Sequence, residues 1–285
     1  MTAPLETRLD FLRRAQNADG GWGYFPHKQS WMEPSAYAML ALHADPAAKP
    51  AWERAWTWMR GLQLPDGSWA AAAAVREPHW TTALAVILHV TAKVHDQAFV
   101  RGVEWLLGVA GKENGLLFRV VQKLRPGIVE LDSSVKAWPW RLGGSSWIEP
   151  TAHALVALKR SAAAAGQARV RERVAQGERM ILDRKCIDGG WNYGNRKVLG
   201  HDLPSYPETT ALALYGLQGS RDAGLSSPLE TARRMWSQTR SPLAKAWLAI
   251  ALRGHAVAVP EAETTAGDDI LLAALEVIAA TGALS

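Results

Sequence analysis

The 285-residue sequence predicts an all-α protein in which helical hairpins repeat and form an outer and an inner ring of helices. The first observation is a turn that occurs twice in nearly the same form, as QNADGGW ending at Trp22 and QLPDGSW ending at Trp69. The second is a third copy, KCIDGGW, which ends at Trp191 but has Lys185 in place of the Gln. The third is an alternation between helices with one charged face and helices that are apolar all round. A recurring unit is typical of repeat architectures, and a helix without a polar face must be buried.

The first hairpin shows the pattern of each unit. Residues 5 to 17 repeat apolar positions at spacings of three and four, which predicts an amphipathic outer helix. The inner helix begins at Glu33-Pro34, where Pro loses no hydrogen bond and Glu complements the helix dipole. The same opening recurs at residues 77–78, 149–150 and, reversed, 207–208, each followed by Ser or Thr. We therefore expect hairpins at residues 5–44, 47–92, 96–163, 167–219 and 227–254.

Two features interrupt this regularity. A last helix over about residues 268–281 lacks an outer partner, so the ring must close with eleven long helices or recruit one from elsewhere. Residues 111–147 are inserted into the third hairpin, and long insertions in compact repeat folds are usually functional or mobile. Three tryptophans, at 138, 140 and 147, favour a packed insertion.

Composition restricts the class of protein. With 48% apolar residues and no linker-like stretch, we expect one domain over residues 1–285. The single cysteine, Cys186, excludes an intramolecular disulfide framework, and the charged N-terminus is unlike a secretory signal, so we expect a cytoplasmic protein. No apolar run is long enough to span a bilayer. The net charge of +5 is spread along the chain without interleaved aromatic residues, which argues against nucleic acid as a partner.

The turn follows the order aromatic, apolar, three residues, Gln, three residues, Gly, one residue, Trp. Residues 11–22 and 58–69 match it fully, residues 180–191 match it without the Gln, and Trp105-Leu106 begins a copy whose turn is lost to the insertion. In this pattern, and over most of its length, the chain resembles the prenyltransferase and squalene cyclase repeat superfamily, including small bacterial members without an assigned reaction. The resemblance implies an α/α toroid of five to six hairpins whose inner helices surround an apolar pocket for isoprenoids.

The reactions of that superfamily need initiating groups that are not evident here. The resemblance implies an Asp-x-Asp-Asp acid or an Asp-Asp-x-x-Asp magnesium site, yet Asp268-Asp269 is the only adjacent Asp pair and belongs to neither motif. Zinc prenyltransferases use Asp, Cys and His, and Cys186, Asp188 and His201 are of the right type. The inner helix that should supply the histidine, SPLAKAWLAIAL, has none. We therefore expect no metal and no cofactor.

Candidate catalytic residues are polar residues that do not recur in each unit. Asp202 and His201 lie in the loop before an inner helix, where the superfamily usually places its acids, and burial beside His can tune the proton affinity of a carboxyl group. Asp202 is the first candidate acid and Asp132 the second.

Aromatic and glutamate side chains near the inner-helix openings are candidates for binding. Aromatic faces stabilise a cation by about 2 kcal/mol when water is excluded, although aromatic side chains also simply fill space. The glutamates recur, which favours a role in helix capping over catalysis. The expected pocket residues are Trp31, Trp80, Trp138, Trp140, Trp147, His153, Tyr206, Glu149 and Glu208. Trp22, Trp69 and Trp191 are expected to be structural.

These observations lead to a functional hypothesis. We expect a terpenoid-cyclase-like enzyme that binds an isoprenoid or lipid-like molecule and carries out an acid-initiated cyclisation or isomerisation. A non-catalytic lipid-binding or scaffolding toroid is the alternative, and a zinc prenyltransferase-like subunit is the third. Peripheral membrane contact and the oligomeric state stay open.

Overall fold

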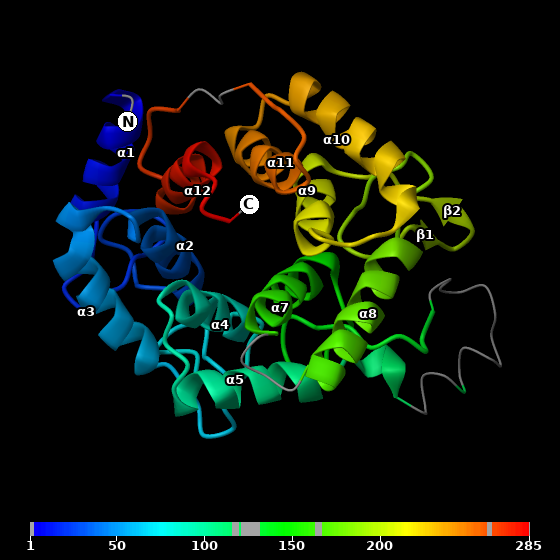
Figure 1. The fold of residues 1–285 in the computed structure, drawn as a ribbon, viewed down its shortest axis with the longest axis horizontal. Helices are drawn as coiled ribbons and strands as arrows, with labels where there is room; N and C mark the ends of the chain where they lie inside the picture. Colours follow the sequence, from blue (N-terminus) through cyan, green and yellow to red (C-terminus); the bar gives the residue numbers. More distant parts are fainter. Residues whose placement is uncertain (1–2, 116–119, 121–131, 163–166, 261–263, 285) are drawn as a thin grey trace.

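The computed structural model describes residues 3–115, 120, 132–162, 167–260 and 264–284. Helices form two concentric rings in this part of the chain, as predicted (Figure 1). The outer ring contains α1 (Ala3–Arg14), α3 (Lys49–Arg60), α5 (Gln97–Gly108), α8 (Gln167–Asp183) and α10 (Ser226–Gln238). The inner ring contains α2 (Met32–Leu42), α4 (Thr82–Thr91), α7 (Ile148–Ser161), α9 (Pro207–Gly216), α11 (Pro242–Gly254) and α12 (Ile270–Thr281). The α/α toroid is confirmed.

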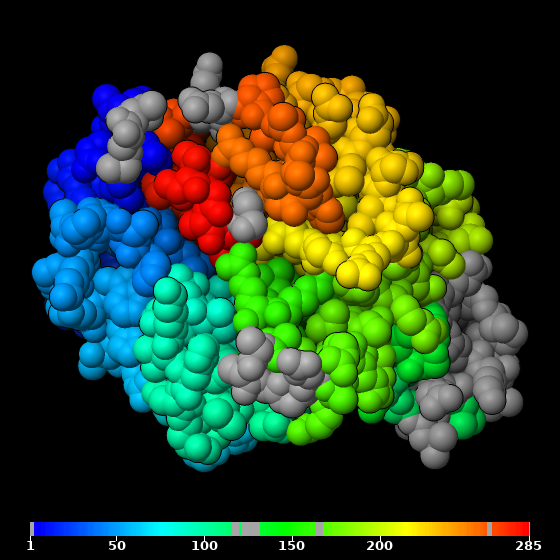
Figure 2. All heavy atoms as spheres, in the orientation of Figure 1, coloured from blue at the N-terminus to red at the C-terminus, as the bar shows by residue number. Residues whose placement is uncertain are grey.

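Short elements connect these helices. They are the 3₁₀ turns η1 (Pro46–Ala48), η2 (Lys112–Asn114) and η3 (Ala223–Leu225), and the antiparallel strands β1 (Lys197–Val198) and β2 (His201–Asp202). Side chains fill most of the space between the ribbons (Figure 2). One apolar cluster of buried residues includes members from Leu5 near the N-terminus to Leu284 near the C-terminus.

Burial follows the sequence pattern of each ring. Along α4, all residues from Thr82 to His89 are buried, as expected for a helix that is apolar all round. In α3, the buried residues are Ala51, Ala55 and Met59, which lie on one face of an amphipathic helix. The hydrophobic effect therefore places the all-apolar helices inside the ring.

The ring closes through α12, which packs against α2, α11 and α1. An ion pair lies at this closure, where Nε of Arg8 on α1 bonds to Glu276 Oε2 on α12 at 2.8 Å. The side chains of Arg8 and Glu276 are 7% and 3% exposed. Arg8 also donates to Gly267 O and Thr265 Oγ1, so its guanidinium is well bonded. The eleven α-helices of the described residues thus complete the ring, with α12 as the sixth inner helix.

Each repeat turn is held by a tryptophan that bonds to both helices of its hairpin. The indole Nε1–H of Trp22 donates to Leu12 O on the outer side at 2.8 Å, and its backbone N–H donates to Ser35 Oγ on the inner helix at 2.8 Å. The same pair of bonds joins Trp69 to Met59 O and Thr82 Oγ1. It also joins Trp191 to Ile181 O and Thr210 Oγ1. The Ser or Thr that follows each inner-helix opening is therefore the acceptor of this turn.

Glycine and glutamine complete the turn. Gly20 has φ of +96°, and a Cβ there would lie 2.8 Å from Arg54 O, so only glycine fits. Gln16 Nε2 donates to Gly20 O and to Ala51 O, which ties the turn to the next outer helix. Gln63 repeats these bonds with Gly67 O and Ala98 O.

The fourth tryptophan of this kind is Trp138, which completes the copy that begins at Trp105-Leu106. Its indole donates to Leu106 O at 2.9 Å and its backbone N–H to Thr151 Oγ1 at 3.2 Å, although 32 residues separate Trp138 from Leu106. Trp138 therefore has a structural role in the turn, and it is 2% exposed with the Arg173 guanidinium over its ring. The insertion precedes the turn rather than replacing it.

Substitution of Glu276 by Ala should destabilise the fold by about 3–5 kcal/mol, because it leaves the buried Arg8 guanidinium without its counter-charge. Glu104→Ala is the matched control, since Glu104 pairs with Arg169 at the exposed surface and such pairs contribute about 0–1 kcal/mol. Urea unfolding followed by circular dichroism measures both. Equal losses in the two variants would contradict a structural role for the closing ion pair.

Candidate functional site

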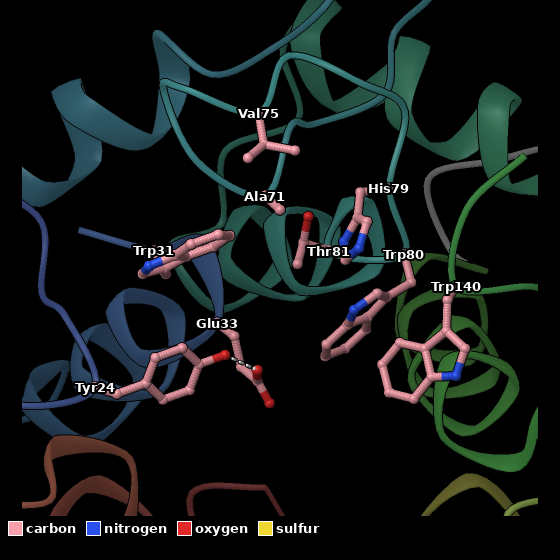
Figure 3. Close-up of a pocket in the computed structure, with 9 residues that line it drawn as sticks. All are labelled: Tyr24, Trp31, Glu33, Ala71, Val75, His79, Trp80, Thr81 and Trp140. Carbon is pink, nitrogen blue, oxygen red and sulfur yellow. Dashed lines mark hydrogen bonds between the residues drawn. The ribbon is translucent and has the colours of Figure 1, made fainter. Parts of the chain in front are cut away.

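A pocket of about 310 Å³ lies beside the N-terminal ends of α2 and α4. Aromatic rings form much of its wall, with Trp31 on one side and Trp80 and Trp140 on the other (Figure 3). Its remaining lining residues are Tyr24, Glu33, Ala71, Val75, His79 and Thr81. This volume is at the lower end of the roughly 300–1,000 Å³ usual for small-molecule sites. The pocket therefore suits a small ligand or one segment of a longer one.

The turn bonds place one residue of each unit in an equivalent position at the ring mouth. Counting two residues back from the Ser or Thr acceptor of each turn gives Glu33, Trp80, Glu149 and Glu208. Glu77, which belongs to the same sequence pattern, is instead exposed on the preceding loop, and Trp80 takes the equivalent place. Among the described residues, the Glu33 carboxyl bonds to Tyr24 and the Glu208 carboxyl to Ser241, and neither bonds to a backbone N–H, so direct hydrogen-bonded capping does not explain these glutamates.

Glu33 lines the pocket and Glu149 does not, but the two carboxyl groups are close enough for the Glu33 charge to act on Glu149. Tyr24 donates its hydroxyl proton to Glu33 Oε2 at 2.5 Å (Figure 3), which lowers the pKa of Glu33, but burial outweighs this bond and the pKa is raised overall. The Glu149 carboxyl has no hydrogen bond to any described residue. Burial and the neighbouring Glu33 charge raise the pKa of Glu149 to about 8, so this carboxyl group is mainly protonated at neutral pH.

An axial aromatic cluster forms where the inner helices meet, and it consists of Tyr37, Trp80, His153, Tyr215 and Trp247. Ring centroids of Trp80, Tyr215 and Trp247 lie 4.8, 5.7 and 6.0 Å from that of His153. Because Trp80 belongs to both the pocket wall and this cluster, the two are contiguous. The cluster was not predicted as a unit, although Tyr37, Tyr215 and Trp247 are conspicuous as bulky residues in Ala- and Leu-rich inner helices.

His153 connects the aromatic cluster to the mouth through hydrogen bonds. Its Nδ1 lies 2.9 Å from the backbone oxygen of Glu149, and the Tyr37 hydroxyl lies 2.5 Å from its Nε2. Burial lowers the pKa of His153 to about 4, so the ring is neutral. A neutral ring that donates from Nδ1 accepts the Tyr37 proton at Nε2. This chain fixes both ring orientations below Glu149.

Several predicted binding residues lie at the mouth. Trp31, Trp80 and Trp140 line the pocket. Trp147 and Tyr206 immediately precede α7 and α9, as Trp31 precedes α2, and the Tyr206 ring pairs with that of Tyr193. Glu208 accepts a hydrogen bond from Ser241 Oγ at 3.2 Å. Tyr24 and Glu33 were absent from the predicted site, although Glu33 has the same place in the repeat as Glu149 and Glu208; no pattern marked Tyr24.

The three predicted catalytic residues lie elsewhere. Asp202 and His201 are exposed on β2, whose hairpin lengthens the spacing between turn tryptophan and acceptor from 13 to 19 residues in this unit. Asp132 pairs with Arg179 and accepts from Ser134, and these neighbours lower its pKa. None of the three lines the pocket. Their geometry does not support a role as buried acid, because a solvent-facing carboxyl group lacks the low-dielectric setting.

The zinc prenyltransferase-like alternative requires a cluster of metal-binding side chains. Among the described residues, no group of three His, Cys, Asp or Glu side chains could hold a metal ion. Cys186 is buried in the third turn, and burial raises the pKa of its thiol. No helix in the same part of the chain has the length and apolar character needed to cross a membrane.

Similarity to known proteins appears only at the level of structure. No family model matches the chain, and no curated protein matches it. A variant of the type II terpene cyclase MstE from Scytonema aligns with a TM-score of 0.60 at 14% identity, covering 99% of this chain and 97% of that one. A GH8 endo-β-1,4-glucanase from an Achatina fulica gut metagenomic library aligns with a TM-score of 0.65 at 14% identity, covering 99% and 97%. A protein from Actinoplanes aligns with a TM-score of 0.56 at 20% identity, covering 88% and 74%. These similarities establish the shared α/α toroid fold.

The Glu149→Gln variant should gain stability over the unmodified protein as pH rises, measured as the free energy of unfolding. The pKa of Glu149 is near 4.5 when unfolded and about 8 when folded, so its contribution is complete below pH 4.5 and is lost as pH rises through 8. The difference in free energy of unfolding between the two proteins should change by roughly 3–5 kcal/mol between pH 5 and pH 8.5. Urea unfolding at several pH values measures it, with Glu77→Gln as the exposed control. A difference that does not vary with pH would contradict the buried acid.

Proposed function

We propose that the protein binds an isoprenoid-like molecule at the aromatic mouth of the toroid and initiates its cyclisation or isomerisation by proton transfer from Glu149. The observation that carries this proposal is the half-buried Glu149 carboxyl group, which has no hydrogen bond to any described residue and whose pKa is raised to about 8 by burial and by the Glu33 charge. Such a group can act as a general acid at neutral pH. The terpene cyclase MstE, which shares the fold, binds geranylgeranyl dihydroxybenzoate as its substrate.

The aromatic walls suit the charge that proton transfer would create. Trp31, Trp80 and Trp140 present their rings around one small cavity (Figure 3). A cation over an aromatic face gains about 2 kcal/mol or more where water is excluded. Several such faces favour a carbocation over its neutral precursor, which is the requirement for an ionising cyclase.

The acidity of Glu149 restricts the bond that it can attack. A carboxyl group with a pKa of about 8 is a weak acid, whereas an unactivated alkene needs a strong one. Proton transfer to an oxygen is easier, because the C–O bond then breaks with its electron pair on that oxygen and leaves an allylic cation. With an alcohol as substrate the oxygen leaves as water, and return of a proton from the cyclised or rearranged cation to the Glu149 carboxylate forms an alkene and restores the acid. This cycle needs no metal or redox partner.

A second candidate is hydrolysis of a glycosidic bond, which the same pair of glutamates favours. Glycosidases use one protonated and one ionised carboxyl group on either side of the bond that breaks. Burial raises the pKa of both glutamates, and the Glu33 charge raises that of Glu149 further, so Glu149 is the protonated member of the pair; the GH8 glucanase shares the fold. The non-catalytic lipid-binding toroid remains the alternative to both enzymes.

Incubation with farnesyl, geranylgeranyl and squalene-type alcohols and diphosphates, followed by product analysis, tests the proposal. We expect conversion of an oxygenated isoprenoid by the unmodified protein and a loss of at least about 100-fold in Glu149→Gln, because general acids typically contribute 10²–10⁴-fold. Glu77→Gln should retain full activity, since its side chain is exposed outside the site.

Other outcomes identify the alternatives. Loss of turnover in Asp202→Asn but not in Glu149→Gln would identify Asp202 on β2, and not Glu149, as the catalytic acid. Release of reducing sugar from β-glucan, abolished in Glu149→Gln, would favour the glycosidase. Tight binding of isoprenoids without any product would leave a binding protein.

A further inference from the structure

The side chain of His79 forms part of the pocket wall (Figure 3). Its Nδ1 is buried and has no hydrogen-bond partner among the described residues, and the residue lines the cavity between Thr81 and Trp80 (Figure 3). A buried polar atom without a partner is costly, and native proteins satisfy most such atoms. The imidazole of His79, a residue that lines the pocket, therefore has hydrogen-bonding capacity that no described residue uses.

The backbone around His79 holds the ring in place. Residue 79 forms isolated β-bridges with Trp69 on one side and with Arg141 on the other. Its carbonyl oxygen accepts from both the backbone N–H and the hydroxyl of Thr82 at the start of α4. Trp80, the next residue, donates its backbone N–H to Trp140 O at 3.0 Å. These bonds fix the backbone position from which the imidazole extends, which preorganises this part of the pocket wall.

The charges around the pocket select the kind of ligand group. Burial lowers the pKa of His79 to about 4, so its ring is neutral at physiological pH. No Lys or Arg is among the nine residues that line the pocket, and Glu33 is one of them. An anionic group such as a carboxylate or a diphosphate would therefore meet a carboxyl group and no cation. A neutral polar group fits this setting.

The hydrogen-bonding capacity of the His79 imidazole further restricts which ligand group can bind to it. In one tautomer, Nδ1 of a neutral imidazole donates a proton, and in the other it accepts one. A hydroxyl group can serve both tautomers, whereas an ether or a ketone can serve only the donor form. The Glu33 carboxyl, across the same cavity, offers a further polar contact for a hydroxyl proton.

We propose that His79 is a specificity-determining residue that binds a hydroxyl group, so the pocket selects an alcohol with an apolar body over the corresponding hydrocarbon or diphosphate. The isoprenoid nature of that body rests on the proposed function, but recognition of the hydroxyl group does not. The aromatic walls contact the apolar body, and His79 fixes the oxygen end.

Binding measurements with matched ligands test this directly. The ligands are farnesol, its methyl ether, farnesene and farnesyl diphosphate, and quenching of tryptophan fluorescence reports binding because Trp31, Trp80 and Trp140 line the pocket. We expect farnesol to bind at least about tenfold more tightly than farnesene, in line with the effect of one buried hydrogen bond. Farnesyl diphosphate should bind no better than farnesene.

Two variants assign the preference to His79. His79→Phe keeps a planar ring without nitrogen and should bind farnesol and farnesene equally. His79→Asn places an amide near the position of Nδ1 and should retain part of the preference. His27→Gln is the matched control on an exposed histidine and should behave like the unmodified protein. Circular dichroism confirms that each variant is folded.

The outcomes separate this inference from the proposed function. Equal binding of farnesol and farnesene by the unmodified protein, or an unchanged preference in His79→Phe, overturns the role of His79 and leaves the isoprenoid site. If no isoprenoid binds but cellobiose does, the proposed function fails, and loss of cellobiose binding in His79→Phe with retention in His79→Asn still supports hydroxyl recognition. Absence of binding by every probe overturns both.

Discussion

Each of the four hairpins with a turn tryptophan depends on the two hydrogen bonds that this tryptophan makes. The indole donates to a carbonyl at the end of the outer helix, and the backbone N–H donates to a hydroxyl in the first turn of the inner helix. These bonds satisfy groups that a helix end would otherwise leave unpaired, and the ring itself is fully buried. The tryptophan thus fixes where each inner helix starts relative to its outer helix. Since the constraint recurs from unit to unit, the inner-helix N-termini converge at one mouth of the toroid.

Because the inner-helix N-termini converge, side chains that are far apart in the sequence lie together at the mouth. The position two residues before each acceptor hydroxyl carries Glu in three units and Trp80 in one. A role in the helix dipole explains why Glu recurs, but it does not explain a glutamate whose carboxyl is held protonated, because the dipole favours the charged form. The protonated state of Glu149 follows from ring geometry, which places a second carboxyl and several aromatic rings near it. The proposed chemistry at this mouth therefore depends on the glutamates that recur at one repeat position and on Trp80, which replaces glutamate in one unit.

The sequence was sufficient for the fold and insufficient for the site, for physical reasons. Helix periodicity and the turn motif are local, so they predicted both rings and the hairpins. Closure through α12 joins residues 268 positions apart, and the Arg8–Glu276 pair that seals it leaves no local pattern. Trp138 was not predicted to be a turn tryptophan, because the insertion separates it from Leu106 and hides its register. Asp202 was favoured because it does not recur, yet it belongs to an extra hairpin that carries it to the surface. Burial and the coupling of Glu33 with Glu149 exist only after the ring has closed.

Trp80 gives the mouth its chemical asymmetry. In ring order it stands between Glu33 of α2 and Glu149 of α7, where the repeat would otherwise place a fourth carboxyl group. An apolar ring there removes water and leaves no cation between the two glutamates, so each raises the cost of ionising the other. The same ring packs on neutral His153, which bonds to the backbone of Glu149. One substitution within the repeat therefore lowers the local dielectric, shapes the pocket wall and connects the wall to the aromatic cluster below. The unit that departs from the glutamate pattern is thus the one that makes the remaining glutamates suitable for acid chemistry.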